Sequence, residues 1–154
     1  MAEGGAVHVR YSIRAPRQVL TSPGPGRPQR KLGHIMQASI HNITFDCADA
    51  RAQAQFWAAV TGGTAEQRDG TPGHVEYVVL PAAAGAPRLY FTTVPEPKQV
   101  KNRVHLDLNP PDHGQQAELA RLAGLGARVI GGQPPGAGWV VLADPEGNEF
   151  CLEP

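Results

Sequence analysis

An internal repeat is the feature that most constrains this sequence. At a spacing of 63 residues, two strand positions, a candidate helix cap, a core position and a helix-ending glycine coincide without a gap. The matched pairs are Asn42 with His105, Thr44 with Asp107, Asp49 with Asp112, Phe56 with Leu119, and Gly63 with Gly126. Because signals of three different kinds coincide, chance matches of apolar residues do not explain them. The chain is therefore predicted to contain two copies of one unit.

The first copy predicts the order strand, helix and three strands. Its candidate strands are residues 39–46, 64–67, 74–80 and 88–93. Asp49 is placed to cap a helix over residues 50–61, and Gly62 is placed to end it. Phe56 and Trp57 lie on this helix and are expected in the core.

The second copy begins after a linker over residues 94–102, which carries two prolines and two lysines. Its candidate strands are residues 104–108, 128–130, 139–142 and 148–152. Asp112 is expected to cap a second helix and to form a capping box with Gln115, and Gly126 is expected to close it. The prediction is an α+β fold of tandem βαβββ modules, at about 37–94 and 103–154, with paired four-stranded mixed sheets that are too small to be stable alone.

Residues 1–36 differ in composition from the rest of the chain. They hold six Arg or Lys and one acid, which gives +5, and the other 118 residues give −5. The segment is rich in Pro and Gly and is predicted to be a disordered extension. Three alternatives stay open: Met36 is the true start, residues 7–13 pair as a short strand, or the segment is a basic arm that contacts a partner.

Bulk properties exclude several classes of protein. The net charge is zero, which does not favour a nucleic acid or an acidic membrane as partner. No apolar run approaches the roughly 20 residues that cross a bilayer. Cys47 and Cys151 form no spaced metal motif. We interpret them as free thiols in a reducing cytoplasm.

Four segments resemble the vicinal-oxygen-chelate superfamily, in its glyoxalase-like branch. They are DCADARAQAQFWAAVTGG (46–63), KNRVHLDL (101–108), AELARLAGLGARV (117–129) and VLADPEGNEFCL (141–152). The last is the most specific, because the superfamily carries DPxGN before its final strand. The resemblance covers nearly all of residues 37–154 and implies that the two sheets form a cup around a ligand cavity.

The resemblance also implies where a metal would bind. In metal-using members, each module supplies one ligand from its first strand and one from its last, and the ion polarises vicinal oxygens of the substrate. His105 stands at one such position and its counterpart is Asn42. Cys151 stands where a carboxylate is expected, and Glu149 precedes it on the same strand face. A divalent metal on His105 and Glu149 is therefore a degenerate site, and glyoxalase I activity is not expected.

Other candidate residues follow from strand parity and from the same resemblance. His105 suits proton transfer near pH 7, with Asp107 beside it; the alternative is a hydrogen-bonded cavity histidine. Asn42 is expected to face the cavity and His41 the helix. The remaining ligand-binding candidates are Asp46, Arg103, Trp139 and Cys151, the last of which is otherwise a small buried thiol.

Two functions remain open at this stage. One is an enzyme of lyase, isomerase or dioxygenase type that acts on a small oxygenated metabolite. The other is a non-catalytic binder that resembles the bleomycin-resistance proteins of the superfamily. A purely structural or interaction domain is a third reading. A homodimer is expected by analogy with the fold.

Overall fold

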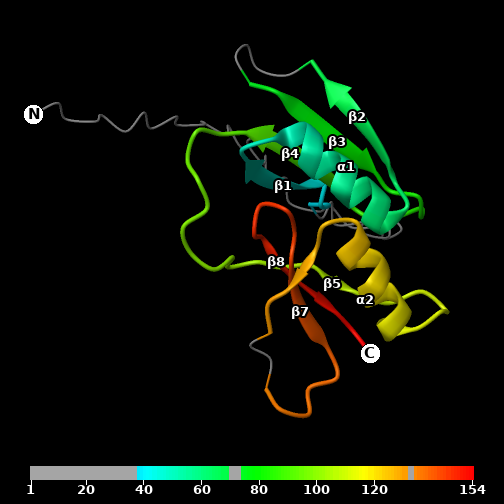
Figure 1. The fold of residues 1–154 in the computed structure, drawn as a ribbon. Coiled ribbons are helices and arrows are strands. Elements are labelled where there is room, and N and C mark those ends of the chain that lie inside the picture. Colours follow the sequence, from blue (N-terminus) through cyan, green and yellow to red (C-terminus); the bar gives the residue numbers. More distant parts are fainter. Residues whose placement is uncertain (1–37, 70–73, 132–133) are drawn as a thin grey trace, which may run out of the picture. The chain divides into compact units, whose positions relative to one another are not determined.

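The computed structural model describes residues 38–69, 74–131 and 134–154 (Figure 1), so the predictions for residues 1–36 lie outside the described residues. The first module contains β1 (Asn42–Cys47), α1 (Ala50–Thr61), β2 (Thr64–Arg68), β3 (Glu76–Leu80) and β4 (Arg88–Thr93). The second contains β5 (Asp107–Leu108), α2 (Gln115–Gly124), β6 (Arg128–Val129), β7 (Val140–Ala143) and β8 (Glu149–Leu152). The predicted tandem βαβββ order is confirmed. No helix among the described residues is long and apolar enough to cross a membrane.

The two sheets have the same topology. Their strand orders are β1-β4-β3-β2 and β5-β8-β7-β6. In each sheet the first strand is parallel to the last, and the other neighbours are antiparallel. Both sheets are therefore mixed, and β1 and β5 lie at corresponding edges.

Helix α1 begins and ends at the predicted residues. The Asp49 side chain accepts a hydrogen bond from the Ala52 amide at 2.9 Å, and Gly62 ends the helix with φ of 69°. This left-handed conformation favours glycine. Phe56 and Trp57 are buried as predicted. Gln53 is also buried, which the apolar pattern did not indicate.

The capping box predicted at the start of helix α2 is not formed. The helix begins at Gln115, and its N-cap is Gly114, which supplies no side-chain hydrogen bond. Asp112 lies in the turn before it, where the Gly114 amide donates to the Pro111 carbonyl at 2.9 Å. The turn that follows Pro110 and Pro111 delays the helix, so neither Asp112 nor Gln115 is in position to form the box.

Several strands are shorter than the alternating pattern predicted, and β1 and β5 differ most, because each begins three residues late. β1 begins at Asn42 rather than residue 39, and β5 comprises Asp107 and Leu108 rather than residues 104–108. The backbone before β5 still contacts the sheet, because the Cys151 amide donates to the Leu106 carbonyl at 2.9 Å. His105 therefore stands just before the strand that was expected to contain it.

The modules share one hydrophobic core. Phe150 of β8 packs against Phe56 and Trp57 of α1, with ring centroids 6.3 and 5.2 Å apart. Leu122 of α2 is fully buried in the same cluster. At the other end of α1, Arg121 donates to the carbonyls of residues 59 and 60 at 2.9 and 3.1 Å.

The DPEGN turn, residues 144–148, joins the modules through polar contacts. Asp144 is buried; its Oδ1 accepts from the amides of Glu146 and Asn148 at 3.0 and 2.8 Å. Its Oδ2 accepts from Trp57 Nε1 at 3.3 Å. The Glu146 carboxylate accepts from the amides of Ala48 and Asp49 at 2.8 Å each. The turn thus sets its own geometry and also holds the start of α1.

Candidate functional site

The second sheet has a core face and an opposite face. In β8, Phe150 and Leu152 are buried in the core cluster, so Cys151 between them points away from it. Leu142 of β7 is likewise in the core, which puts Val141 on the face of Cys151. We call the side that carries Cys151 and Val141 the open face of the second sheet.

Three polar side chains of the open face come together. One potential ligand atom from each of His105, Asp107 and Cys151 lies within 4.8 Å of the other two. The sheet register explains this, because Asp107 of β5 is paired directly with Cys151 of β8. His105 Nδ1 is 3.6 Å from Asp107 Oδ1, and both side chains are partly exposed to solvent. The structure thereby brings together three of the residues singled out in the sequence.

The protonation of Cys151 is set by its surroundings. Burial raises the pKa of the Cys151 thiol, and the hydrogen bond to Asp107 and the negative charge of that carboxylate raise it further. The thiol is therefore protonated at neutral pH when no cation is bound. Cys47 is less suited still to be a nucleophile, because burial and the Glu146 carboxylate raise its pKa to about 12.

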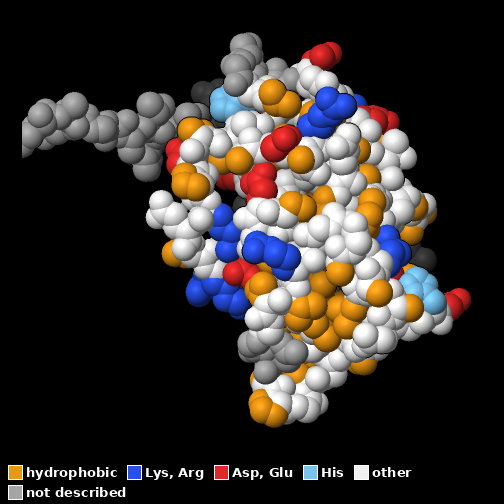
Figure 2. Space-filling view, viewed as in Figure 1, with side chains coloured by type: hydrophobic (Ala, Val, Ile, Leu, Met, Phe, Trp, Pro, Cys, Tyr) orange, Lys and Arg blue, Asp and Glu red, His pale blue; other side chains and the backbone are white. Residues whose placement is uncertain are grey.

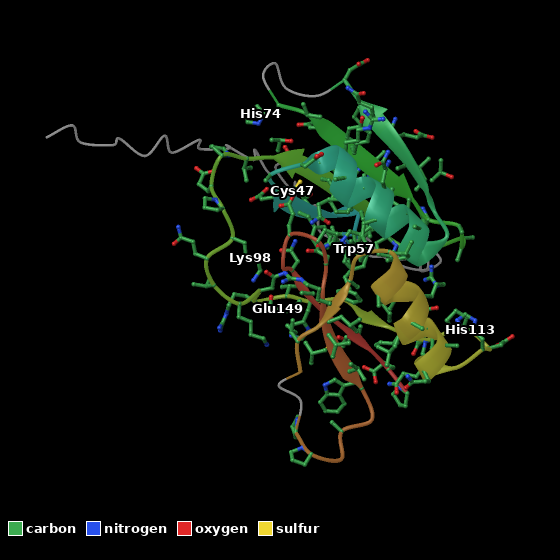
Figure 3. All side chains as sticks on the ribbon, in the orientation of Figure 1. Cys47, Trp57, His74, Lys98, His113 and Glu149 are labelled. Atoms are coloured by element: carbon green, nitrogen blue, oxygen red, sulfur yellow. The ribbon has the colours of Figure 1, made fainter. Side chains whose placement is uncertain are left out.

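Glu149 lies outside the group of three. Its carboxylate accepts from Lys98 Nζ at 3.2 Å and from the Asn102 amide at 3.0 Å, so it holds the linker in place (Figure 3). Burial opposes its ionisation, but these hydrogen bonds outweigh burial and lower the pKa of Glu149. Glu149, which was predicted to bind a metal, therefore has a structural role that would compete with metal binding.

A cavity of about 940 Å³ adjoins the group of three at His105; Asp107 and Cys151 do not line it. Consecutive residues 43–48 line one wall, so the cavity follows the open edge of β1 rather than one face of its sheet. Most of the other wall is the linker before β5, residues 96–106. Figure 2 shows Lys and Arg side chains gathered at the left of the view, where this linker runs in Figure 1. Asp46, Arg103 and His105 line the cavity, together with Lys101.

Other candidates are placed elsewhere. Asn42 and Trp139 do not line this cavity; Asn42 Nδ2 donates to Thr44 Oγ1 at 2.8 Å. His41 was expected to face the helix, but it is exposed before β1 and contacts the Arg88 guanidinium. The expectation was wrong because the strand begins after His41, where alternation does not yet apply.

Sequence reasoning missed a polar pair on the first sheet. Tyr90 donates to Glu76 Oε2 at 2.5 Å, and this hydrogen bond raises the pKa of Tyr90. The two residues lie 14 positions apart on neighbouring strands. Their pairing depends on the register of β3 and β4, which strand alternation alone does not fix.

Comparison with known proteins identifies the class. A model of the glyoxalase-like domain family matches residues 42–153, and the chain belongs to this family. With its paired mixed sheets, it is a member of the vicinal-oxygen-chelate superfamily, as the sequence motifs indicated. A search of curated proteins gave no match.

Solved structures share the fold at low identity. The fosfomycin resistance protein FosX from Mesorhizobium loti is 17% identical, with a TM-score of 0.59 over 77% of this chain and 92% of that one. A mutant FosX from Listeria monocytogenes, in complex with Mn(II) and 1S,2S-dihydroxypropylphosphonic acid, is 15% identical, with a TM-score of 0.61 over 77% and 93%. A glyoxalase/bleomycin resistance protein/dioxygenase family enzyme from Burkholderia phytofirmans is 17% identical, with a TM-score of 0.54 over 75% and 97%.

Proposed function

We propose that this protein is a metal-assisted enzyme that acts on a small oxygenated metabolite, with a divalent cation held by His105, Asp107 and Cys151. The observation that supports the proposal most directly is the convergence of these three side chains within 4.8 Å. Three protein ligands with an open position are the usual composition of a catalytic zinc site.

The donor set indicates which cation fits. Imidazole and thiolate donors suit zinc and iron(II), whereas manganese prefers carboxylate and water oxygens. The Listeria relative was solved with Mn(II). Because Cys151 contributes sulfur, we expect this chain to prefer zinc, cobalt(II) or iron(II) over manganese. A bound cation would act as a Lewis acid on vicinal oxygens of the ligand.

The surrounding residues have separate roles in this proposal. Lys101 and Arg103 line the adjoining cavity and attract an anionic group of the ligand. Asp46 lies on the opposite wall and accepts a hydrogen bond from a ligand hydroxyl.

The test is the metal content of protein purified without an affinity tag. We expect close to one zinc or iron per chain, and loss of that metal in His105→Ala. His74→Ala is the matched control, since His74 is an exposed histidine of the first module (Figure 3). Cobalt substitution adds a second readout, because a Cys151 ligand gives a cobalt–thiolate absorption band that Cys151→Ser removes. Metal retained by His105→Ala would refute the site.

A non-catalytic binding protein is the alternative function. The observation in its favour is that Asn42, the counterpart of His105, bonds to Thr44 and stays outside the group of three. The metal site then has no ligand from the first module. If the protein contains no metal and catalyses no reaction on vicinal diols or thiohemiacetals, ligand-induced thermal shifts become the appropriate screen. The expected homodimer is tested by sedimentation.

A further inference from the structure

The open face of the second sheet continues from the polar group into apolar residues. Strand pairing places Asp107 beside Cys151, and Cys151 beside Val141. The Ile130 amide donates to the Val141 carbonyl at 3.0 Å, so Ile130 extends the same row across the sheet. One row of side chains therefore runs from a carboxylate and a thiol to two branched aliphatic residues.

Exposed apolar side chains gather at the aliphatic end of this row. Ile130 is 48% exposed and Trp139 is 37% exposed. Trp139 immediately precedes β7, but the pairing with the chain after β8 continues past it, because a Cβ on Gly138 would meet the Pro154 ring at 3.1 Å. The alternation of β7 therefore extends to Trp139 and places it on the open face with Val141. The other tryptophan, Trp57, is 1% exposed. Exposed apolar area that is gathered in one place is often buried when a partner or ligand binds.

The backbone that carries Trp139 is fixed in position. Gln115 Nε2 lies 2.8 Å from the Gly138 carbonyl, 3.2 Å from the Leu152 carbonyl and 3.0 Å from the Glu153 carbonyl. The start of β7 is thus held to the end of β8 by one side chain of α2. A side chain on a fixed backbone binds a ligand at a lower cost in conformational entropy than one on a mobile loop.

We infer that the ligand of this site carries a flat apolar group, such as an aromatic ring, which lies on Ile130, Val141 and Trp139 while its oxygens reach the cation. The inference rests on the proposed metal site and adds the chemical class of the ligand. The polar end of the row faces the cation, and the apolar end removes the ring from water. The site should therefore bind aromatic or long aliphatic ligands more tightly than small polar ligands that carry the same chelating group.

Two hydroxamates with the same chelating oxygens test the inference. Acetohydroxamate carries a methyl group, and benzohydroxamate carries a phenyl ring. We expect the zinc-loaded protein to bind benzohydroxamate at least ~10-fold more tightly, as measured by calorimetry, and ring binding to change the emission of Trp139. Trp139→Ala and Ile130→Ser should each reduce this preference to about 3-fold or less without changing the affinity for zinc.

Val129→Ser is the matched control. Val129 is an exposed apolar residue, 59% exposed, that directly precedes Ile130 but is paired with Leu142 of the core face. It should leave the preference unchanged. The inference would be overturned, and the proposed function would stand, if zinc-loaded protein bound the two hydroxamates equally. The same conclusion would follow if the preference for benzohydroxamate survived in both Trp139→Ala and Ile130→Ser. A failure to bind zinc would refute the proposed function, and the inference with it.

A second copy of the chain is the competing occupant of the same face. Sedimentation of Trp139→Ala and Ile130→Ser distinguishes the two cases. An unchanged oligomeric state supports a ligand surface. Dissociation of a dimer in these variants, but not in Val129→Ser, would show a subunit interface and would also overturn the inference.

Discussion

Cys151 links metal binding to pH at the scale of a single residue. Burial and the Asp107 carboxylate raise the pKa of this thiol, so a cation must displace its proton at neutral pH. At lower pH the proton competes more strongly with the metal for the thiolate. We expect zinc affinity to fall by about 10-fold for each pH unit below the raised thiol pKa, as measured by chelator competition between pH 7 and 9.

Cys151→Ser is the comparison for this pH dependence. It should bind zinc more weakly and lose the thiol-linked slope over the same range, because the variant has no thiol proton for the cation to displace. An unchanged slope in Cys151→Ser would show that another group supplies the displaced proton and would remove Cys151 from the site.

At the scale of the element, two helix-end glycines should respond in opposite ways to alanine. A Cβ on Gly63 would meet Val79 Cγ1 at 2.9 Å and would overlap the Leu80 carbonyl oxygen, which is backbone and cannot move aside. A Cβ on Gly124, the last residue of α2, would meet nothing within 4 Å. Gly63→Ala should therefore lower the free energy of unfolding by about 1–3 kcal/mol, and Gly124→Ala should raise it by up to about 1 kcal/mol. Urea denaturation measures both, and equal effects would contradict the close approach at Gly63.

The N-terminus of α1 depends on a side chain from the other module. The Glu146 carboxylate accepts hydrogen bonds from the amides of Ala48 and Asp49 at 2.8 Å each. Removing this carboxylate leaves both amides without their partner and only partly solvated. Glu146→Ala should lower the free energy of unfolding by about 1–3 kcal/mol. Glu66→Ala is the control, because Glu66 forms an exposed ion pair with Arg68 at 3.4 Å, and its loss should cost less than about 1 kcal/mol. Equal losses would show that the contact at α1 is not specific.

Local signals in the sequence predicted the elements, and long-range contacts account for what was missed. Asp49 and Gly62 act within one turn of α1, so the residues themselves revealed them. The capping box at Asp112 failed because the turn after the two prolines competes with it. Within the site, strand parity predicted that Asp107 shares a face with His105, and the family resemblance predicted that Cys151 belongs to the same site. Strand parity could not indicate that the cavity follows the edge of β1, because that depends on how the modules pack.

At the scale of the whole molecule, the duplication gives two sheets that are stable only together. Each four-stranded sheet buries one face, and part of that burial comes from the other module. Phe150 of the second module packs on Trp57 of the first, and Trp57 donates to Asp144. Residues 38–154 form one compact unit by their contacts. The site depends on this packing, because its cavity is lined by both modules.

This interdependence predicts a single cooperative unfolding transition. Trp57 reports on the first module and Trp139 on the second, so Trp139→Phe and Trp57→Phe each leave one fluorescent reporter. Within each variant, the fluorescence and far-ultraviolet circular dichroism transitions in urea should coincide, because the modules share their core. Arg121→Met removes the hydrogen bonds from α2 to the end of α1, and it also removes one of the two partners of the buried Glu118, the other being His113. Since the hydrogen bonds to α1 join the modules, the variant should lower the urea midpoint of the fluorescence transition and of the dichroism transition by the same amount. If the Trp139 fluorescence transition moved and the dichroism transition did not, the modules would unfold independently.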